Sequence, residues 1–219
     1  MRSLIFFSLS VLLALYSCKK DEEIVCDPIV NAAPVYQSFS EGSYWTYQNV
    51  RIESDGTETI ESAVDSIVVA GDTLINGLEY TVFEGTSWPF QDNEWGIIWI
   101  LREQDGALLD EQGNIIMSCC NFTDTLNTVE YPSGEEIFAT TTYMMSNEIP
   151  EITVPGGTFA GIELVGTFTI LNEPEAPDNP RYTSRYYAQG IGQIRDTWFF
   201  AANTEIRYEK RLLDYHIGY

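Results

Sequence analysis

The chain has 219 residues, with 33 Asp and Glu against 11 Lys and Arg, so its formal net charge is −22 at pH 7. A chain this acidic lacks the basic surface that nucleic-acid phosphates require, which argues against DNA or RNA as a partner. Hydrophobic residues make up 44% of the chain, enough for a packed core, and the single histidine, His216, argues against catalytic triads and most zinc sites.

The chain begins with features of a secretion signal. A short cationic start, Met1–Ser3, precedes an apolar run over Leu4–Leu15. Because a membrane-spanning helix needs about 20 apolar residues, this run predicts a cleaved signal peptide over residues 1–17. Leu15–Cys18 resembles the bacterial lipobox, in which the cysteine becomes the lipidated first residue of the mature protein. A plain secretory signal with an incidental cysteine is the alternative.

Lipidation of Cys18 would tether the mature protein to a membrane. Each buried methylene contributes about 0.8 kcal/mol, so two or three acyl chains, palmitate among them, hold almost irreversibly. The next five residues resemble the signal that directs lipoproteins of Bacteroidota to the outer face of the outer membrane. A solvated charged linker and the periplasmic face are the alternatives. The five residues are Lys19, Lys20, Asp21, Glu22 and Glu23.

Residues 18–39 lack periodicity and are expected to form a linker, whereas residues 40–219 are typical of a β-domain. Runs rich in Val, Ile, Thr, Tyr, Phe and Trp recur there between Gly, Asp and Asn. The expected strands are Tyr44–Ile52, Glu58–Val69, Leu78–Glu84, Gly96–Arg102, Ala107–Leu109, Asn114–Met117, Ile137–Met145, Thr158–Ile170, Arg181–Ala188, Gly192–Phe200 and Thr204–Asp214.

Three of these segments carry further information. Thr158–Ile170 and Thr204–Asp214 alternate apolar and polar residues, so each is expected to bury its apolar face. Gly96–Leu101 is apolar throughout, which predicts a central strand covered on both faces. Tight turns are predicted at Asp55-Gly56, Asn76-Gly77 and Asp105-Gly106, and an extended loop over Asn172–Pro180.

These patterns predict an all-β fold with a single domain. No segment shows helical periodicity, and we expect one antiparallel, strongly curved sheet or barrel-like domain. A half-barrel and a lipocalin-like closed barrel both fit. Basic residues gather in its last part, within an otherwise acidic chain, so we expect them to lie against acidic neighbours: Arg181, Arg185, Arg195, Arg207, Lys210 and Arg211.

Three further stretches, taken with the lipobox, carry a family resemblance. Glu41–Tyr47 contains G-x-x-W-x-Y, Thr153–Phe159 contains V-P-x-G-T-F, and Tyr186–Ile194 contains a glycine-bearing hairpin motif. Together they resemble uncharacterised outer-membrane or surface lipoproteins of Bacteroidota. The resemblance implies an envelope lipoprotein with a β-rich domain, and it implies no activity and no site residue. The glycines would permit tight turns, and Trp45 and Phe159 would fill the core.

Three cysteines remain once Cys18 is lipidated, and in an oxidising compartment they are candidates for a disulfide. Cys26 could pair with Cys119 or Cys120, or the two adjacent cysteines could pair with each other. Buried thiols are the third possibility. No Lys, Arg or His lies nearby in sequence to lower a thiol pKa, so a redox role has no support.

An aromatic-rich region supplies the candidate binding residues. Trp88, Phe90 and Trp95 could stack on a ligand such as a sugar, although Trp95 also reads as a core residue. Acid-rich stretches at 92–94 and 105–114 could supply oxygen ligands to calcium, but neither has EF-hand spacing. We expect no metal and no other cofactor.

The sequence favours a non-catalytic, membrane-anchored binding or assembly module whose partner is a glycan, an apolar ligand or an envelope protein. It contains no nucleophile, zinc or nucleotide motif, so an enzyme is not expected. The second hypothesis is a lipocalin-like carrier of an apolar ligand. The third is a glycan-active enzyme that uses two carboxylates. An apolar cavity would favour the carrier, and an open cleft with two facing carboxylates would favour the enzyme.

Overall fold

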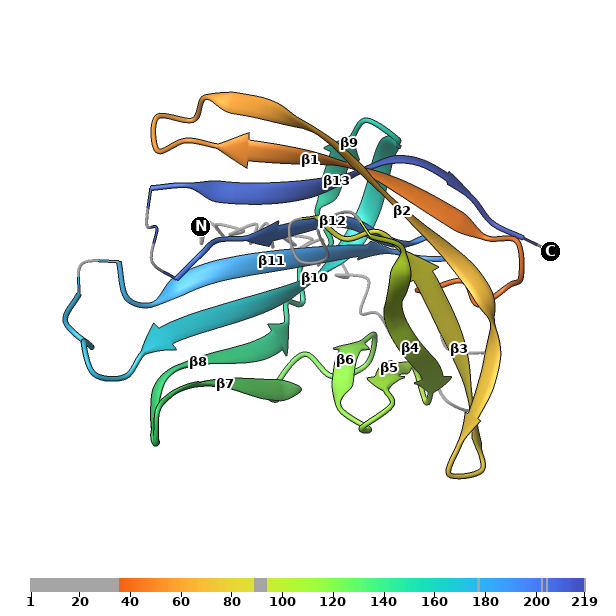
Figure 1. Cartoon of the computed structure of the whole chain (residues 1–219), viewed down its shortest axis with the longest axis horizontal. Coiled ribbons are helices and arrows are strands. Elements are labelled where there is room, and N and C mark those ends of the chain that lie inside the picture. Colours follow the sequence, from red (N-terminus) through yellow and green to blue (C-terminus); the bar gives the residue numbers. More distant parts are fainter. Residues whose placement is uncertain (1–35, 89–93, 177, 202, 204, 219) are drawn as a thin grey trace, which may run out of the picture.

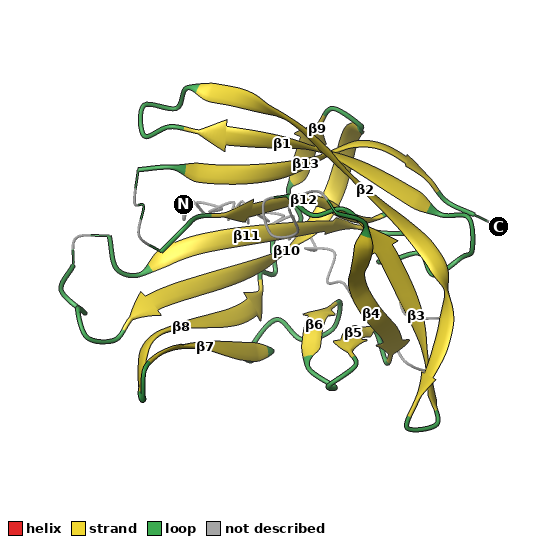
Figure 2. Cartoon of the chain, in the orientation of Figure 1, coloured by secondary structure: helices red, strands yellow, loops and turns green. Residues whose placement is uncertain are grey.

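The computed structural model describes residues 36–88, 94–176, 178–201, 203 and 205–218, and within them the chain forms thirteen strands and no helix (Figures 1 and 2). The predicted signal peptide, Cys18, the five residues after it, Cys26 and Phe90 lie outside the described residues. The strands are β1 (Tyr44–Ile52), β2 (Glu58–Ile75), β3 (Leu78–Gly85), β4 (Gly96–Gln104), β5 (Ala107–Asp110), β6 (Ile115–Ser118), β7 (Asn127–Ser133), β8 (Glu136–Met145), β9 (Glu151–Val154), β10 (Gly157–Ile170), β11 (Arg181–Ala188), β12 (Gly192–Trp198) and β13 (Arg207–His216).

All strands belong to one antiparallel sheet that curls almost into a closed barrel (Figure 1). Its order is β6-β5-β4-β3-β2-β1-β13-β12-β11-β10-β8-β7, with β9 paired to β10 beside this path. The first and last strands of the chain pair along their whole length, from Tyr44 opposite His216 to Ile52 opposite Arg207. The remaining seam lies between β6 and β7. The predicted all-β, strongly curved sheet is therefore confirmed.

Tight turns join neighbouring strands at positions that the sequence predicts. The β2–β3 turn holds Asn76 at φ 53° and Gly77 at φ 82°, and the β4–β5 turn holds Asp105 at φ 53° and Gly106 at φ 74°. Two successive residues with positive φ give the hairpin turn whose twist matches that of the flanking strands. These two turns set the register of β2 against β3 and of β4 against β5.

Burial confirms one predicted alternation and corrects another expectation. Along β10, Ile162, Leu164 and Phe168 are buried, whereas the odd-numbered residues between them are partly exposed. Strand β4 is not covered on both faces, because the side chain of Ile97 is 54% exposed. An irregularity in the β3–β4 register falls between the partners of Ile97 and Trp99 and breaks the alternation of β4 at that point. Its uniformly apolar sequence therefore does not reflect two covered faces.

Strand β13 departs from a simple apolar-in pattern. Leu212 is completely buried, as the alternation predicts, but two charged residues, Glu209 and Lys210, are also buried. Buried charges must be paired or hydrogen-bonded to be tolerated. The partners of Lys210 lie inside the barrel, where they form part of the site described below.

A hydrophobic core fills the end of the barrel at which β1 begins and β11 ends, and the three resemblance motifs meet there. The indole N–H of Trp45 donates to the backbone oxygen of Ile191 at 2.7 Å, and the hydroxyl of Tyr47 donates to that of Gln193 at 2.9 Å. These bonds tie the opening strand to the β11–β12 hairpin. The third motif joins them through the Gly156 N–H, which donates to the Leu212 oxygen at 2.9 Å.

Side chains fill the seam that lacks backbone pairing. A second hydrophobic cluster draws from β5 and β6 on one side and from β8, β10 and β11 on the other. Tyr36 belongs to it, and residues 36–38, the last part of the expected linker, are buried. The chain leading into β1 thus packs within the barrel. The cluster comprises Tyr36, Leu108, Met117, Cys119, Met145, Ile162, Leu164 and Tyr187.

Candidate functional site

A cavity of about 560 Å³ lies inside the barrel, towards the end at which β11 begins and β12 ends. Its walls are mostly apolar and aromatic, and they come from segments on both sides of the seam. Polar side chains face it mainly from β11, β12 and β13. The apolar and aromatic lining residues are Trp88, Ile98, Trp99, Leu101, Leu108, Ile116, Tyr131, Phe138, Tyr143, Phe168, Tyr187, Trp198, Phe199 and Ala201.

Two groups of aromatic rings stiffen these walls. Trp198 and Tyr208 stack at an interplanar angle of 17°, with ring centroids 5.8 Å apart, and Trp88 packs against both. Rings in such contact are favourable beyond the area that they bury, and they leave little freedom to collapse into the cavity. The second group consists of Tyr131, Phe168 and Phe199, with centroid distances of 5.5 and 5.7 Å.

An ion pair between Asp65 of β2 and Lys210 of β13 forms part of the interior wall. The Lys210 Nζ lies 2.8 Å from the Asp65 carboxylate, whose side chain is fully buried. Asp65 also accepts hydrogen bonds from the Asn49 amide at 3.1 Å and from the Trp88 backbone N–H at 2.8 Å. Three donors therefore compensate the buried carboxylate, and Lys210 contributes to the cavity lining.

A second ion pair, between Arg185 of β11 and Asp196 of β12, lies beside the first. The Arg185 Nε is 3.2 Å from the Asp196 carboxylate, and the two residues are direct cross-strand partners. Asp196 is in turn opposite Lys210. Charges of alternating sign thus lie on four of the five adjacent strands from β2 to β11, with β1 as the exception. We call these four residues the charged belt: Asp65, Lys210, Asp196 and Arg185.

Charge and burial together set the protonation states of the side chains around the belt. The negative charge of Asp196 raises the pKa of Arg185 above its ordinary value, so the guanidinium stays charged. Burial raises the pKa of Tyr143 and of Tyr187. Both phenols therefore remain neutral at physiological pH. The Arg185 guanidinium lies 5.9 Å from the centroid of the Tyr143 ring, so it is held between an acid and an aromatic wall.

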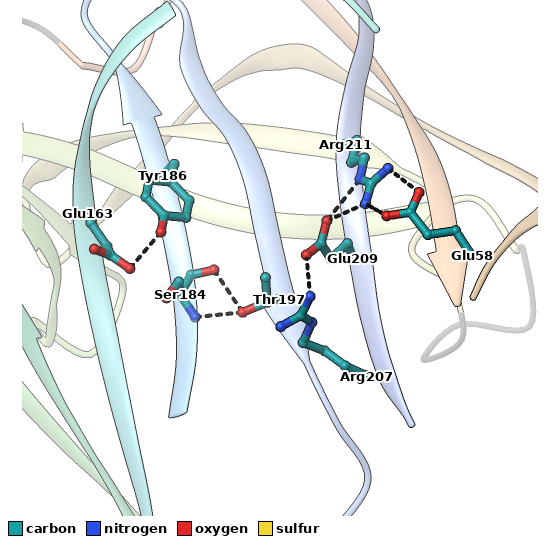
Figure 3. Close-up of polar contacts among 8 residues, drawn as sticks. All are labelled: Glu58, Glu163, Ser184, Tyr186, Thr197, Arg207, Glu209 and Arg211. Atoms are coloured by element: carbon teal, nitrogen blue, oxygen red, sulfur yellow. Dashed lines mark hydrogen bonds and ion pairs between the residues drawn. The ribbon is translucent and has the colours of Figure 1, made fainter. Parts of the chain in front are cut away.

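The outer face of the same strands carries a separate network (Figure 3). Arg211 binds both carboxylate oxygens of Glu58, at 2.7 and 2.8 Å, and also binds Glu209, which in turn pairs with Arg207 at 3.3 Å. We call residues 181–219, which hold the six basic residues, the closing segment. When the ion pairs of the charged belt are included, four of these six residues pair with acids, as predicted. The other two lie on aromatic rings: Arg181 on Phe199, and Arg195 on Tyr186.

The structure separates the predicted stacking residues. Trp88 lines the cavity. Trp95 is 55% exposed and its indole donates to Glu84 at 3.2 Å, outside the cavity lining. Sequence reasoning did not identify Arg185, Asp196 or Lys210 as site residues. The signal that could have found them was the concentration of basic residues in the closing segment.

The two adjacent cysteines lie close together after strand β6. Cys120 takes part in a disulfide, and its sulfur lies 3.1 Å from that of the buried Cys119. Because Cys26 is outside the described residues, the pairing stays a prediction.

The Asp110 carboxylate accepts hydrogen bonds from the backbone N–H groups of Gln112 and Asn114, which closes a turn. Over the described part of the chain, no cluster of three or more His, Cys, Asp or Glu suits a metal ion.

Comparisons with known proteins add two distant structural similarities. No protein-family model matches the chain, and no curated protein matches its sequence. A candidate exported protein of Bacteroides fragilis with a YmcC-like fold is 12% identical, with a TM-score of 0.44 over 84% of this chain and 99% of its own. A candidate lipoprotein of Parabacteroides distasonis is 13% identical, with a TM-score of 0.42 over 85% of this chain and 100% of its own. Similarities of this size support no conclusion about the fold or activity of this chain.

Proposed function

We propose that the chain is an envelope lipoprotein whose barrel binds a small, largely apolar ligand in its cavity. The observation that carries the proposal is the cavity of about 560 Å³ with aromatic and aliphatic walls. Protein interiors are close-packed, with few voids larger than a water molecule, whereas ligand pockets measure roughly 300–1,000 Å³. A void of this size beside a well-packed core is therefore better explained as a binding site than as a packing defect.

The same geometry separates this carrier function from glycan hydrolysis. Hydrolysis of a glycosidic bond needs two carboxylates that face the substrate about 5–10 Å apart. Among the described lining residues, Asp196 is the one carboxylate, and it is paired with Arg185. Asp65 is enclosed by its three donors. The cavity therefore favours binding over hydrolysis.

The proposed location rests on the N-terminal sequence. Cys18 would carry the lipid, and Lys19–Glu23 would direct the protein to the cell surface, as the resemblance to Bacteroidota lipoproteins implies. Within the described residues, no helix has the length and hydrophobicity to cross a membrane. On this proposal the acyl anchor tethers the protein to the membrane, and the cavity encloses its ligand away from water.

Titration with a neutral apolar fluorophore, N-phenyl-1-naphthylamine, tests the cavity. The wild-type protein should bind it saturably with one site per chain. Thr183 lines the cavity and pairs with Gly166, which has no side chain, so a Thr183→Trp side chain can enter the cavity. We expect it to weaken binding at least about tenfold, since it removes the volume that the probe occupies.

Thr167→Trp is the matched control. Thr167 neighbours Tyr182, which is 62% exposed, so this tryptophan points away from the cavity and should leave binding unchanged. Two results would contradict the proposal. One is the absence of saturable binding to the wild-type protein, and the other is equal affinity for the two tryptophan variants when both are folded by circular dichroism.

A further inference from the structure

We propose that the ligand carries an anionic head group of the carboxylate class, which binds Arg185 inside the cavity while the apolar remainder lies against the aromatic walls. This inference rests on the proposed function, because it names the chemistry of the ligand for the same site. It starts from the charges that line the cavity. Two cations, Arg185 and Lys210, and one anion, Asp196, contribute to the lining, whereas Asp65 does not.

The two cations differ in how fully the protein satisfies them. Lys210 donates to the fully buried Asp65 and lies 3.3 Å from the Ser87 hydroxyl, and only 9% of its side chain is exposed. Arg185 meets Asp196 through its Nε at 3.2 Å and also hydrogen-bonds the Tyr187 side chain, yet 32% of its own side chain stays exposed. A guanidinium has five N–H donors, and carboxylates bind its planar edge with two parallel hydrogen bonds. Arg185 is therefore the cation with capacity to bind a further anion.

A cationic ligand would find no equivalent partner. Asp65 is enclosed, with Lys210, Asn49 and the Trp88 backbone as its donors. The carboxylate of Asp196 already lies against Arg185. A ligand cation would have to displace a protein cation from one of these acids, whereas a ligand anion can add to Arg185 beside Asp196. The polar end of the cavity therefore favours an anion.

The rest of the lining describes the remainder of the ligand. Arg185 lies over the Tyr143 ring, and Phe168 and Phe199 pack at 5.5 Å in the same wall. Trp88 and Trp198 form the wall beside Lys210 and Asp196. Flat aromatic faces next to Arg185, the cation with capacity for a further anion, suit an amphipathic acid with an aromatic or aliphatic body. A hydrophilic anion such as free phosphate would leave these walls without contacts.

Two fluorophores with the same skeleton test this assignment. N-phenyl-1-naphthylamine is neutral, and 8-anilinonaphthalene-1-sulfonate is the same frame with an anionic sulfonate, which stands in for the carboxylate. The net charge of −22 opposes adsorption of the sulfonate to the outer surface. Arg185→Gln should weaken binding of the anionic probe about 10-fold to 100-fold, as expected for loss of a charge-assisted hydrogen bond, and should change binding of the neutral probe less than about threefold.

Asp196→Asn is the decisive partner variant, because it breaks the same ion pair but leaves Arg185 charged. It should strengthen binding of the anionic probe, so the two variants must move that affinity in opposite directions. If the ion pair had a merely structural role, both variants would change the affinity for the anionic probe in the same direction. The inference is overturned if the anionic probe binds both variants as it binds the wild type, or if Asp196→Asn weakens it.

The outcomes separate this inference from the proposed function. Failure of the neutral probe to bind the wild-type protein would refute the apolar cavity site itself. Binding of the neutral probe without any dependence of the anionic probe on Arg185 would refute only the head-group assignment. If Arg185→Gln does not fold, judged by its thermal transition, the direction of the Asp196→Asn effect still decides the question.

Discussion

The Asp65–Lys210 pair shows how a single buried carboxylate constrains this barrel. Asp65 has no exposed surface, and its two neutral donors, Asn49 and the Trp88 backbone, cannot neutralise its charge. Lys210→Met therefore leaves an uncompensated charge in the interior. We expect it to lower the free energy of unfolding by about 3–5 kcal/mol at pH 7, measured by urea denaturation.

The double variant Asp65→Asn/Lys210→Met separates charge from packing. It removes both charges and keeps similar side-chain volume, so it should regain most of the stability that the single variant loses. Glu53→Gln provides a control at an exposed pair, because Arg51 and Glu53 are 39% and 37% exposed; its cost should stay below about 1 kcal/mol. A double variant no more stable than Lys210→Met would show that the lost contact is not electrostatic.

At the scale of strands, the sequence predicted elements whose residues alternate or end in recognisable turns. Eleven of the thirteen strands were expected, most within a few residues of their ends. Strand β7 was missed because it lies at an edge, with largely exposed residues and Pro132 inside it. Strand β9 was missed because only Ile152 and Val154 are buried in its four residues. Short or edge strands carry too few buried side chains to leave a pattern.

The outer ion network links strands that are not neighbours, because β1 lies between β2 and β13. Arg211 bridges them by binding Glu58 with two hydrogen bonds (Figure 3). These bonds lower the pKa of Glu58 below its ordinary value of 4.5. A carboxyl group with a lowered pKa in the folded state stabilises the fold above its unfolded pKa and loses that contribution as pH falls through its folded pKa.

Glu58→Gln should therefore destabilise the protein near pH 6 and lose that effect as the pH approaches 3. Glu58 is 47% exposed, so the difference at pH 6 should be below about 1 kcal/mol. Urea denaturation of wild type and variant at pH 3, 4, 5 and 6 measures it. The exposed Glu136 provides a matched Glu→Gln control. An effect of Glu58→Gln that does not shrink on acidification would contradict the role assigned to the Arg211 bridge.

For the whole molecule, the sequence indicated the curved sheet but not its cavity. A cavity depends on which distant side chains meet once the sheet has closed, and Trp88, Phe168 and Trp198 come from three separate segments. No local sequence pattern indicates that these three side chains come together. The basic closing segment was the one informative long-range signal, and half of its six residues line or approach the interior aromatic walls: Arg181, Arg185 and Lys210.

The charge of the whole molecule bears on its proposed place in the cell. Removal of the predicted signal peptide, residues 1–17, would take away Arg2 and leave a net charge of −23. An anionic protein is repelled by an anionic membrane surface, so electrostatic adsorption cannot replace a covalent anchor. We therefore expect Cys18→Ala to release the protein from the membrane fraction and to abolish labelling by a metabolically incorporated palmitate analogue. Continued labelling, or retention in membranes, would contradict lipidation at Cys18.

Surface display is a separate property, because a lipidated protein can face either the outside or the periplasm. Replacement of Lys19–Glu23 by alanine keeps Cys18 and should therefore keep palmitate labelling. If those residues direct export, the variant should become resistant to protease added to intact cells, whereas the wild-type protein is cleaved. Ile24→Ala, directly after the segment, controls for any change near the anchor. Cleavage of the alanine variant at the wild-type rate would leave the anchor in place and remove the export role from these five residues.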